Sequence, residues 1–267
     1  MEIEQAIAIR SYERLEKFVV AFAEGRINLL VIVGSGGLQK SRVVQAHVPT
    51  SSCWIQGNAS PFGIYLKLFQ FRDRLIVIDD VDGLTRDRHG INLLKCLCQT
   101  EKTKVVSWLT GTRQLSAEGV PREFETNSRV CIIANEWGRK QDRNLAAVAD
   151  RGQIVHFVPT REEVHRRTAD WFDDPEIYEW FGSRLDRISK PTMRMYVRAK
   201  ELKLSGLDWK EFCTLSPENP RRNLAIELLA DSSFGTQEER AKAFIERGGG
   251  CRATFFNYAK RLRDAQV

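Results

Sequence analysis

The sequence predicts a three-layer α/β fold with a parallel sheet, followed by two smaller helical parts. Two observations lead to this fold class. Over the first 160 residues, short apolar runs rich in valine and isoleucine alternate with segments of helical periodicity, as in a parallel sheet covered by helices. Beyond them every periodic segment is helical. We therefore expect an α/β domain over residues 1–160, a helical segment over 161–206 and a small all-helical domain over 207–267.

The individual elements follow from local patterns. A first helix is expected over residues 2–23, because apolar side chains recur there at helical spacing and Glu24-Gly25 ends the pattern. Apolar runs bounded by turn residues predict the strands of the sheet at 28–33, 52–55, 74–79, 129–135 and 153–157. Amphipathic segments predict further helices at 40–46, 61–70, 90–99, 142–150, 221–230, 237–247 and 252–264, with a helical region over 161–204.

Composition narrows the class of protein. The 267 residues carry a formal net charge of +6, which is compatible with a polyanionic partner without requiring one. There is no apolar run of about 18 residues and no basic-then-apolar N-terminus, so we expect a cytoplasmic protein with no membrane partner. The six cysteines include no Cys-x-x-Cys pair and do not cluster with the four histidines, which argues against a zinc site.

A glycine-rich turn follows the first expected strand. In Val31-Ile-Val-Gly-Ser-Gly-Gly-Leu-Gln-Lys-Ser41 three apolar residues lead into glycines, then a lysine and a hydroxyl residue where a helix begins. Backbone N–H groups of such a loop can bind phosphates, the lysine adds charge and the serine offers an oxygen to Mg²⁺. The residues expected to bind the nucleotide are Gly34, Ser35, Gly36, Gly37, Leu38, Gln39, Lys40, Ser41 and Arg42. The alternative is an ordinary strand-to-helix turn with an incidental lysine.

A second apolar run ends in carboxylates. Arg74-Leu-Ile-Val-Ile-Asp79-Asp80 reads as a buried parallel strand, whose C-terminal end lies at the ligand-binding edge of the sheet. There Asp79, with Ser41, could hold Mg²⁺, and Asp80 could polarise an attacking water. The alternative is a core strand followed by a polar turn.

Together these motifs resemble the AAA+ ATPases over roughly residues 1–204. The resemblance implies a P-loop NTPase core, with the segment 161–206 as a helical lid. It also implies that Asn135, after a strand, is the sensor 1 residue that orients the lytic water. For Asn135 alone, a turn residue that caps the strand is the alternative.

The resemblance assigns roles to two arginines. Arg151 occupies the arginine-finger position, where it would reach the γ-phosphate bound by a neighbouring subunit, with Arg143 as the competitor. The alternative for Arg151 is a favourable helix C-terminus. Arg194 occupies the sensor 2 position of the lid, with Arg198 second, and a solvated basic helix face is the alternative.

Two positions depart from the family pattern. Asp80 stands where the family usually has glutamate, and Gln39 replaces the glycine before the lysine. Minichromosome-maintenance helicases carry alanine there, so glycine is not strictly required, but the glutamine side chain must point away from the phosphates. The shorter Asp80 can still orient water, and the two departures together leave the rate of hydrolysis open.

A strand is expected after Lys104, since the residues from Val105 to Thr110 alternate in polarity, and it is expected in a hairpin. Some AAA+ groups, including superfamily-3 helicases, point such a hairpin into the central pore. Lys104, Arg113 or Lys102 could then touch DNA phosphates. An ordinary loop is the alternative.

The C-terminal 86 residues, 182–267, are rich in lysine and arginine. Within them the glycines after residue 247 and the following Arg-Ala-Thr resemble the turn of a helix-turn-helix, with Cys251 at the usual serine position. Phe244, Ile245, Phe255 and Leu262 would form its core. The expected DNA-binding residues are Arg252, Thr254, Asn257, Lys260 and Arg261. A plain helical bundle is the alternative.

The sequence therefore predicts an AAA+ ATPase that binds and hydrolyses ATP with Mg²⁺ in order to load on, remodel or unwind DNA. Expected partners are DNA, other copies of the chain in a ring or filament, and a replication or transposition protein. Two alternatives remain. One is a nucleotide-binding switch with slow or absent hydrolysis, and the other is a protein-remodelling assembly factor.

Overall fold

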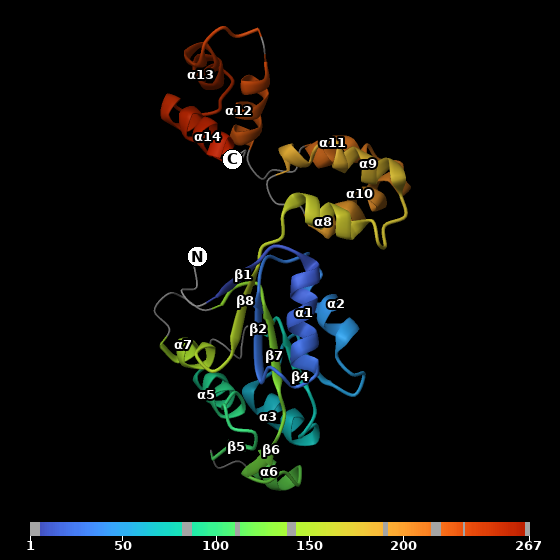
Figure 1. Ribbon diagram of the computed structural model, residues 1–267, viewed down its shortest axis with the longest axis vertical. Helices are drawn as coiled ribbons and strands as arrows, with labels where there is room; N and C mark the ends of the chain where they lie inside the picture. Colours follow the sequence, from blue (N-terminus) through green and yellow to red (C-terminus); the bar gives the residue numbers. More distant parts are fainter. Residues whose placement is uncertain are drawn as a thin grey trace. The chain divides into compact units, whose positions relative to one another are not determined.

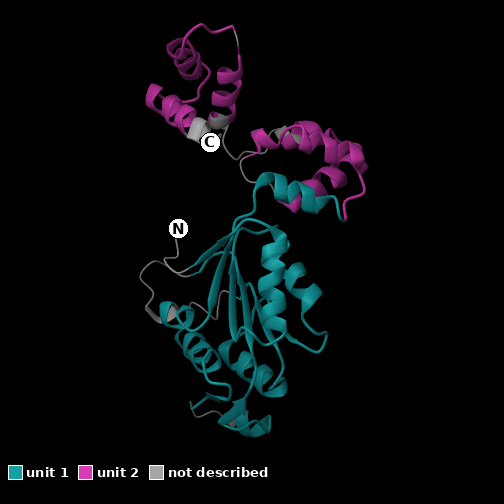
Figure 2. Ribbon diagram, in the orientation of Figure 1, with its two compact units in different colours: residues 1–170 teal, residues 171–267 magenta. Residues whose placement is uncertain are grey.

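A computed structural model describes residues 6–81, 87–109, 113–137, 143–188, 192–214, 220–231 and 233–264. The chain divides into two compact units, residues 1–170 and 171–267 (Figure 2). The first unit holds the sheet and the second is helical. The finer division at residues 160 and 206 stays a prediction.

The first unit is built on a six-stranded sheet whose strands are all parallel, in the order β1-β8-β2-β7-β4-β3 (Figure 1). Strand β2 (Leu29–Val33) lies in the middle and every one of its residues is buried, as expected for a strand covered on both faces. The other strands are β1 (Ile7–Ile9), β3 (Cys53–Gln56), β4 (Ile76–Asp79), β7 (Val130–Ala134) and β8 (Gln153–Phe157). Apart from β1, each lies within two residues of its predicted position.

Helices cover both faces of this sheet, which confirms the three-layer α/β prediction. Helices α1 (Tyr12–Ala23) and α2 (Lys40–His47) lie on one side, and α5 (Arg88–Leu97) and α7 (Arg143–Ala149) on the other (Figure 1). Alternate residues of β2 point toward the second side, where Val31 and Val33 join a buried cluster with residues of α3 (Pro61–Gln70) and α5. Helix α8 (Arg161–Thr168) follows β8.

The predicted helix over residues 2–23 is wrong for residues 7–9, whereas residues 2–5 lie outside the described part of the chain. Residues 7–9 form β1, which pairs in parallel with β8 at the edge of the sheet. The helix begins only at Tyr12, because the Ser11 side chain accepts a hydrogen bond from the Arg14 N–H and caps it. Ile9 is fully buried in this strand, and Ile7, which fitted the helical spacing, belongs to the strand instead.

Strands β5 (Lys104–Ser107) and β6 (Glu123–Thr126) form a separate antiparallel pair, with α6 (Arg113–Ala117) between them, so the predicted pairing of this strand is confirmed. The expectation that Lys104 touches DNA is wrong. Its side chain is only 1% exposed, and its ammonium donates hydrogen bonds to Asn28 Oδ1 at 2.8 Å and to the Ser128 carbonyl. Lys102 is exposed, whereas the Arg113 side chain lies outside the described residues.

The second unit contains two hydrophobic clusters of helices. In one, Phe181, Tyr196 and Trp209 bring together α9 (Pro175–Gly182), α10 (Met193–Leu204) and α11 (Trp209–Thr214), with a 3₁₀ turn at Leu185–Arg187. In the other, Phe244 and Phe255 join α12 (Pro220–Ala230), α13 (Gln237–Glu246) and α14 (Arg252–Asp264). The three C-terminal helices thus match the prediction. Over the described residues, no helix has the length and apolar character needed to cross a membrane.

Candidate functional site

The candidate site lies at the edge of the sheet where the parallel strands end. Gly34 follows β2, Asp79 ends β4, and Asn135 follows β7. Strands β2, β7 and β4 are neighbours, so these ends meet at one edge. Parallel α/β sheets bind ligands in this position.

The glycine-rich loop has a tightly constrained backbone. A Cβ at Gly34 would lie 2.5 Å from the Phe157 carbonyl oxygen, so only glycine fits there. Gly37 has φ of 80°, and Gln39 has φ of 57° and ψ of 24°, which is left-handed backbone. The position before the lysine thus has a backbone conformation that favours glycine, and this is a physical reason for the glycine of the family pattern that Gln39 replaces.

Lys40 is the first residue of α2, and its side chain folds over the loop. Its ammonium donates hydrogen bonds to the carbonyl oxygens of Gly34 at 2.7 Å and Ser35 at 3.0 Å, and to Asn135 Oδ1 at 3.3 Å. The side chain is 6% exposed. The predicted lysine and the predicted sensor residue are therefore in direct contact.

Asn135 continues this contact to the carboxylate after β4. Its Nδ2 lies 3.0 Å from both carboxylate oxygens of Asp80, which has φ of 55°. Lys40, Asn135 and Asp80 thus form one hydrogen-bonded chain across the ends of β2, β7 and β4. These three residues are brought together as the sequence predicts, while their catalytic roles stay predictions.

The two expected metal ligands, Ser41 and Asp79, lie on neighbouring elements of this edge. Ser41 is half-buried in the first turn of α2. Asp79 accepts a hydrogen bond at Oδ2 from Gln56 Nε2, at 2.9 Å, and Gln56 is its register partner on β3. Gln56 was missed by the sequence reasoning, although its place as a polar residue ending an apolar run is the signal that could have identified it.

The start of α2 is suited to an anion. The first N–H groups of a helix have no acceptor within the helix, and the helix dipole adds positive character there. Gln39, although it holds the N-cap position of α2, makes no capping hydrogen bond through its side chain. The remaining loop residues, Ser35, Gly36, Gly37, Leu38 and Arg42, lie around this helix start as predicted, and their contacts with a nucleotide stay predictions.

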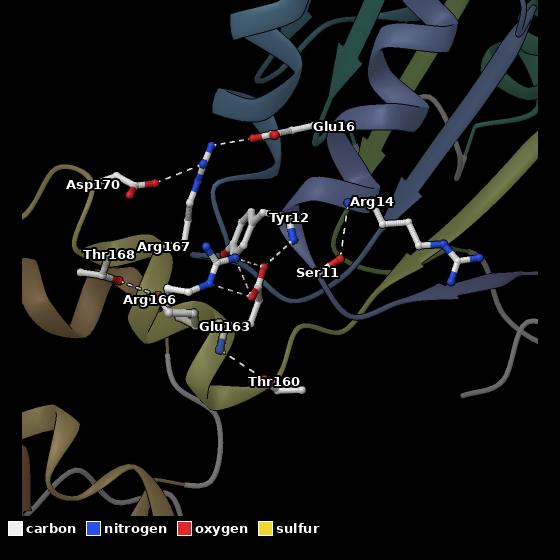
Figure 3. Close-up of polar contacts among 11 residues, drawn as sticks. Ser11, Tyr12, Arg14, Glu16, Thr160, Glu163, Arg166, Arg167, Thr168 and Asp170 are labelled. Carbon is white, nitrogen blue, oxygen red and sulfur yellow. Dashed lines mark hydrogen bonds and ion pairs between the residues drawn. The ribbon is translucent and has the colours of Figure 1, made fainter.

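Tyr12 also reaches the loop, and no sequence pattern pointed to this contact. Its buried hydroxyl donates a hydrogen bond to the Leu38 carbonyl oxygen at 3.1 Å. Burial raises the pKa of the Tyr12 hydroxyl above its usual value, so this group is a donor at neutral pH. Its backbone N–H donates to Glu163 Oε1 of α8 at 2.8 Å (Figure 3). No local pattern links residues 151 positions apart.

Arg151 lies at the other end of the parallel strands, where β8 begins. It follows α7 and precedes β8, whose five residues separate it from the site by roughly 16 Å along the strand. Its Nη1 is buried and has no hydrogen-bond partner among the described residues. Burial raises the pKa of the nearby Cys98 thiol to about 12, an effect that the Lys104 and Arg151 cations oppose. Arg151 is thus not part of the site of its own chain, and its action on a neighbouring subunit stays a prediction. The side chain of Arg143 lies outside the described residues.

Arg194 and Arg198 belong to α10 in the second unit. Both side chains are exposed, while Met193, Tyr196 and Ala199 form the buried face of this helix. Their proposed contact with a nucleotide stays a prediction.

The C-terminal helices only partly match the expected helix-turn-helix. Phe244 and Phe255 are buried as predicted, but Ile245 is 47% exposed because it falls on the outer face of α13, and the Leu262 side chain lies outside the described residues. Arg252 Nε donates to Glu238 Oε2 at 2.9 Å, and the guanidinium lies 4.7 Å from the centre of the Phe256 ring.

The other predicted DNA-binding residues differ in their environment. Thr254 is half-buried and contacts the Cys251 sulfur at 3.2 Å, a hydrogen bond that lowers the pKa of that thiol. Asn257 and Lys260 are exposed. The Arg261 side chain lies outside the described residues.

Comparison with known proteins adds to this geometry. No protein-family model matches the chain. An uncharacterised 36.7 kDa protein of Enterobacteria phage T4 is 25% identical over 224 residues, which are 71% of this chain and 68% of that protein. A DNA replication initiation factor matches 80% of this chain at 13% identity and a TM-score of 0.44, and the match spans 65% of that protein's own length.

A solved structure of RuvB from Thermotoga maritima, an AAA+ ATPase, matches 96% of this chain and 91% of its own, at 11% identity and a TM-score of 0.50. This likeness extends over nearly the whole of both chains. It agrees with the parallel sheet and the loop-to-helix geometry at its edge. The chain therefore has the fold of the AAA+ ATPases.

Proposed function

We propose that this protein binds ATP with Mg²⁺ and hydrolyses it in order to act on DNA. The observation that carries the proposal is the hydrogen-bonded chain from Lys40 through Asn135 to Asp80, placed beside a glycine-rich loop in this fold. Asp80 and Asn135 follow the neighbouring strands β4 and β7, and Lys40 begins the helix after β2. Their charges match the pattern that phosphoryl transfer needs.

Each side chain has a defined task in this proposal. The loop N–H groups and the Lys40 ammonium bind the phosphates, and Asp80 orients and polarises the attacking water while Asn135 holds its carboxylate. Ser41 and Asp79 present the hard oxygen ligands that Mg²⁺ prefers. When bound, Mg²⁺ supplies positive charge that neutralises the phosphate oxygens.

A second function, a nucleotide-dependent switch with slow hydrolysis, is favoured by one contact. Both oxygens of Asp80 accept from the Asn135 amide, so the carboxylate that should activate water is already engaged. The aspartate is also one methylene shorter than the usual glutamate. This contact uses part of the acceptor capacity of Asp80, so the rate of hydrolysis is the quantity that separates the enzyme from the switch.

The proposed action on DNA rests on the C-terminal helices, where Asn257 and Lys260 are exposed on α14. Asparagine reads base edges and lysine binds phosphate. Loading, remodelling and unwinding of DNA are the possible outputs, and assembly of several copies is part of the proposal because Arg151 lies too far from the site of its own chain to serve it.

Replacing Lys40 by alanine is expected to abolish ATP binding and turnover, because it removes the phosphate-binding charge and the partner of Asn135. ATP affinity and turnover, measured with and without DNA, test this. DNA-stimulated turnover that is lost in Lys40→Ala supports the main proposal. ATP binding without turnover favours the switch. Turnover that DNA leaves unchanged favours a protein remodeller.

Lys17→Ala is the matched control, since Lys17 is an exposed lysine of α1 in an i,i+4 ion pair with Glu13. Exposed pairs of this kind contribute little to stability, so this variant should bind and hydrolyse ATP normally. Full activity of Lys40→Ala would contradict the proposed site.

Mixing subunits tests the arginine finger. Arg151→Ala and Lys40→Ala should each be inactive alone, whereas their mixture should regain part of the activity at interfaces that combine an intact Lys40 site with an intact Arg151. Turnover of the mixture against each variant alone measures this. Absence of rescue would show that Arg151 does not act on a neighbouring subunit.

A further inference from the structure

Gln39 holds a backbone conformation that its side chain disfavours. Its φ of 57° and ψ of 24° lie in the left-handed region, where glycine is the usual residue. A non-glycine residue stays in this region only when the surrounding structure holds it there. The loop must therefore contain a contact that stabilises this geometry.

Tyr12 supplies a contact of this kind. Its hydroxyl donates to the carbonyl oxygen of Leu38 at 3.1 Å, and this carbonyl belongs to the planar peptide group that joins Leu38 to Gln39. Fixing the orientation of that plane restrains the φ angle of Gln39. Tyr12 is 1% exposed, so water does not compete freely for the bond.

Tyr12 is itself held on several sides. Its ring and the Phe157 ring form a T-shaped pair, with ring centres 5.0 Å apart and an angle of 75° between the planes. The Arg167 guanidinium lies 5.4 Å from the centre of its ring and forms an ion pair with Glu16 at 2.8 Å (Figure 3). Glu163 accepts the N–H of Tyr12.

Both ends of the loop thus contact the packed pair of residues Tyr12 and Phe157. The Phe157 carbonyl oxygen leaves no room for a Cβ at Gly34, where the loop begins, and the Tyr12 hydroxyl fixes the Leu38 peptide, where it ends. Residues of α8 contact both the backbone N–H and the ring of Tyr12, so α8 supports the residue whose hydroxyl holds the loop.

We propose that Tyr12 is a positioning residue that compensates for the glycine missing at position 39. Its hydrogen bond to Leu38 holds the loop in the binding-competent conformation, which a glycine at position 39 would adopt unaided. The effect on the loop stands by itself, whereas the effect on ATP binding rests on the proposed function.

The first test is a double-mutant cycle without nucleotide, with the variants Tyr12→Phe, Gln39→Gly and both together. The readout is hydrogen exchange of the Val43 amide, which donates to the Gln39 carbonyl oxygen at 3.0 Å and so reports on this residue. Tyr12→Phe should speed this exchange about tenfold in the wild-type background, as expected for one lost hydrogen bond. In the Gln39→Gly background the change should be less than about twofold.

The second test repeats the cycle with ATP affinity. Apparent affinity falls with the fraction of molecules whose loop is competent. Tyr12→Phe should therefore weaken ATP binding about tenfold in the wild-type background and less than about twofold in the Gln39→Gly background. The turnover rate at saturating ATP should not change, because Tyr12 is not placed among the reacting groups.

Tyr65→Phe is the matched control. The Tyr65 hydroxyl also donates to a backbone carbonyl, that of Pro121 at 2.8 Å, in the same unit but away from the loop. It should leave Val43 exchange and ATP affinity unchanged in both backgrounds. Equal losses for Tyr12→Phe with and without Gln39→Gly, or the same coupling for Tyr65→Phe, would overturn the proposal. A wild-type chain that binds no ATP would refute the proposed function, while the exchange cycle would still decide the role of Tyr12.

Discussion

Replacing Asp80 by asparagine is expected to lower ATP turnover about a hundredfold, the usual contribution of a general base, while ATP affinity changes by less than about twofold. Asparagine tolerates the left-handed backbone of this position and keeps an oxygen for the Asn135 amide, so the site should remain folded. The Asp80→Asn variant loses the negative charge that polarises water. Single-turnover kinetics with a separate measurement of ATP binding would reveal this split.

Asp73→Asn is the control for this variant. Asp73 is also left-handed, with φ of 68°, and its Oδ1 accepts the Asn127 N–H at 2.7 Å, but it precedes β4 rather than following it. Its turnover should equal that of the wild type. If Asp80→Asn hydrolyses ATP at the wild-type rate, Asp80 is not the base. If the wild type is already as slow as the variant, the switch describes the protein better.

Gly152→Ala should destabilise the first unit by about 3 kcal/mol, at the upper end of the usual cost of overpacking. A Cβ at Gly152 would lie 2.5 Å from the Leu29 carbonyl oxygen and 2.6 Å from the Leu29 Cβ, and backbone atoms of the central strand cannot move aside cheaply. The melting temperature of the unit should fall by about 6 to 12 °C. Calorimetry or circular dichroism during heating would measure the shift.

Gly63→Ala provides the contrast. Gly63 lies in the first turn of α3, where an added Cβ would meet only the Ser60 Oγ at 3.3 Å. Alanine is the better helix former, so this variant should be neutral or slightly more stable. A Gly152→Ala protein that melts with the wild type would mean that β2 and the start of β8 are less closely packed than described.

Five of the six strands of the sheet were predictable because they are short apolar runs. Each of these runs is long enough to be recognised and ends in a turn or a polar residue. Strand β1 escaped prediction because it has only three residues, and its pairing with β8 is set by a segment far away in the sequence. The burial of Lys104 was not predicted for a similar reason. Its acceptors, Asn28 and Ser128, are far from it in the sequence, so the pattern around Lys104 does not indicate them.

The residues of the candidate site were predictable where they follow the C-terminal ends of the parallel strands. Lys40, Asp80 and Asn135 each stand shortly after an apolar run, and parallel strands must bring these positions together. Tyr12 acts through a contact between distant elements, and no local pattern indicates it. Gln56 ends an apolar run, but its contact with Asp79 depends on the pairing of β3 with β4. For Gln39 the sequence showed that the residue was unusual, but the left-handed backbone that makes it so is a property of the folded loop.

The strand order has a consequence for how the protein is made. Strand β2 lies between β7 and β8, so the hydrophobic residues Leu29–Val33 gain their second partner, β8, only about 120 residues later in the chain. At ribosomal rates of about 5 to 20 residues per second, that interval lasts roughly 6 to 24 s. During it an apolar strand and the loop after it lack at least one of their sheet neighbours. The glycine-rich loop, which follows β2, is therefore among the last parts of the first unit to gain all its sheet neighbours.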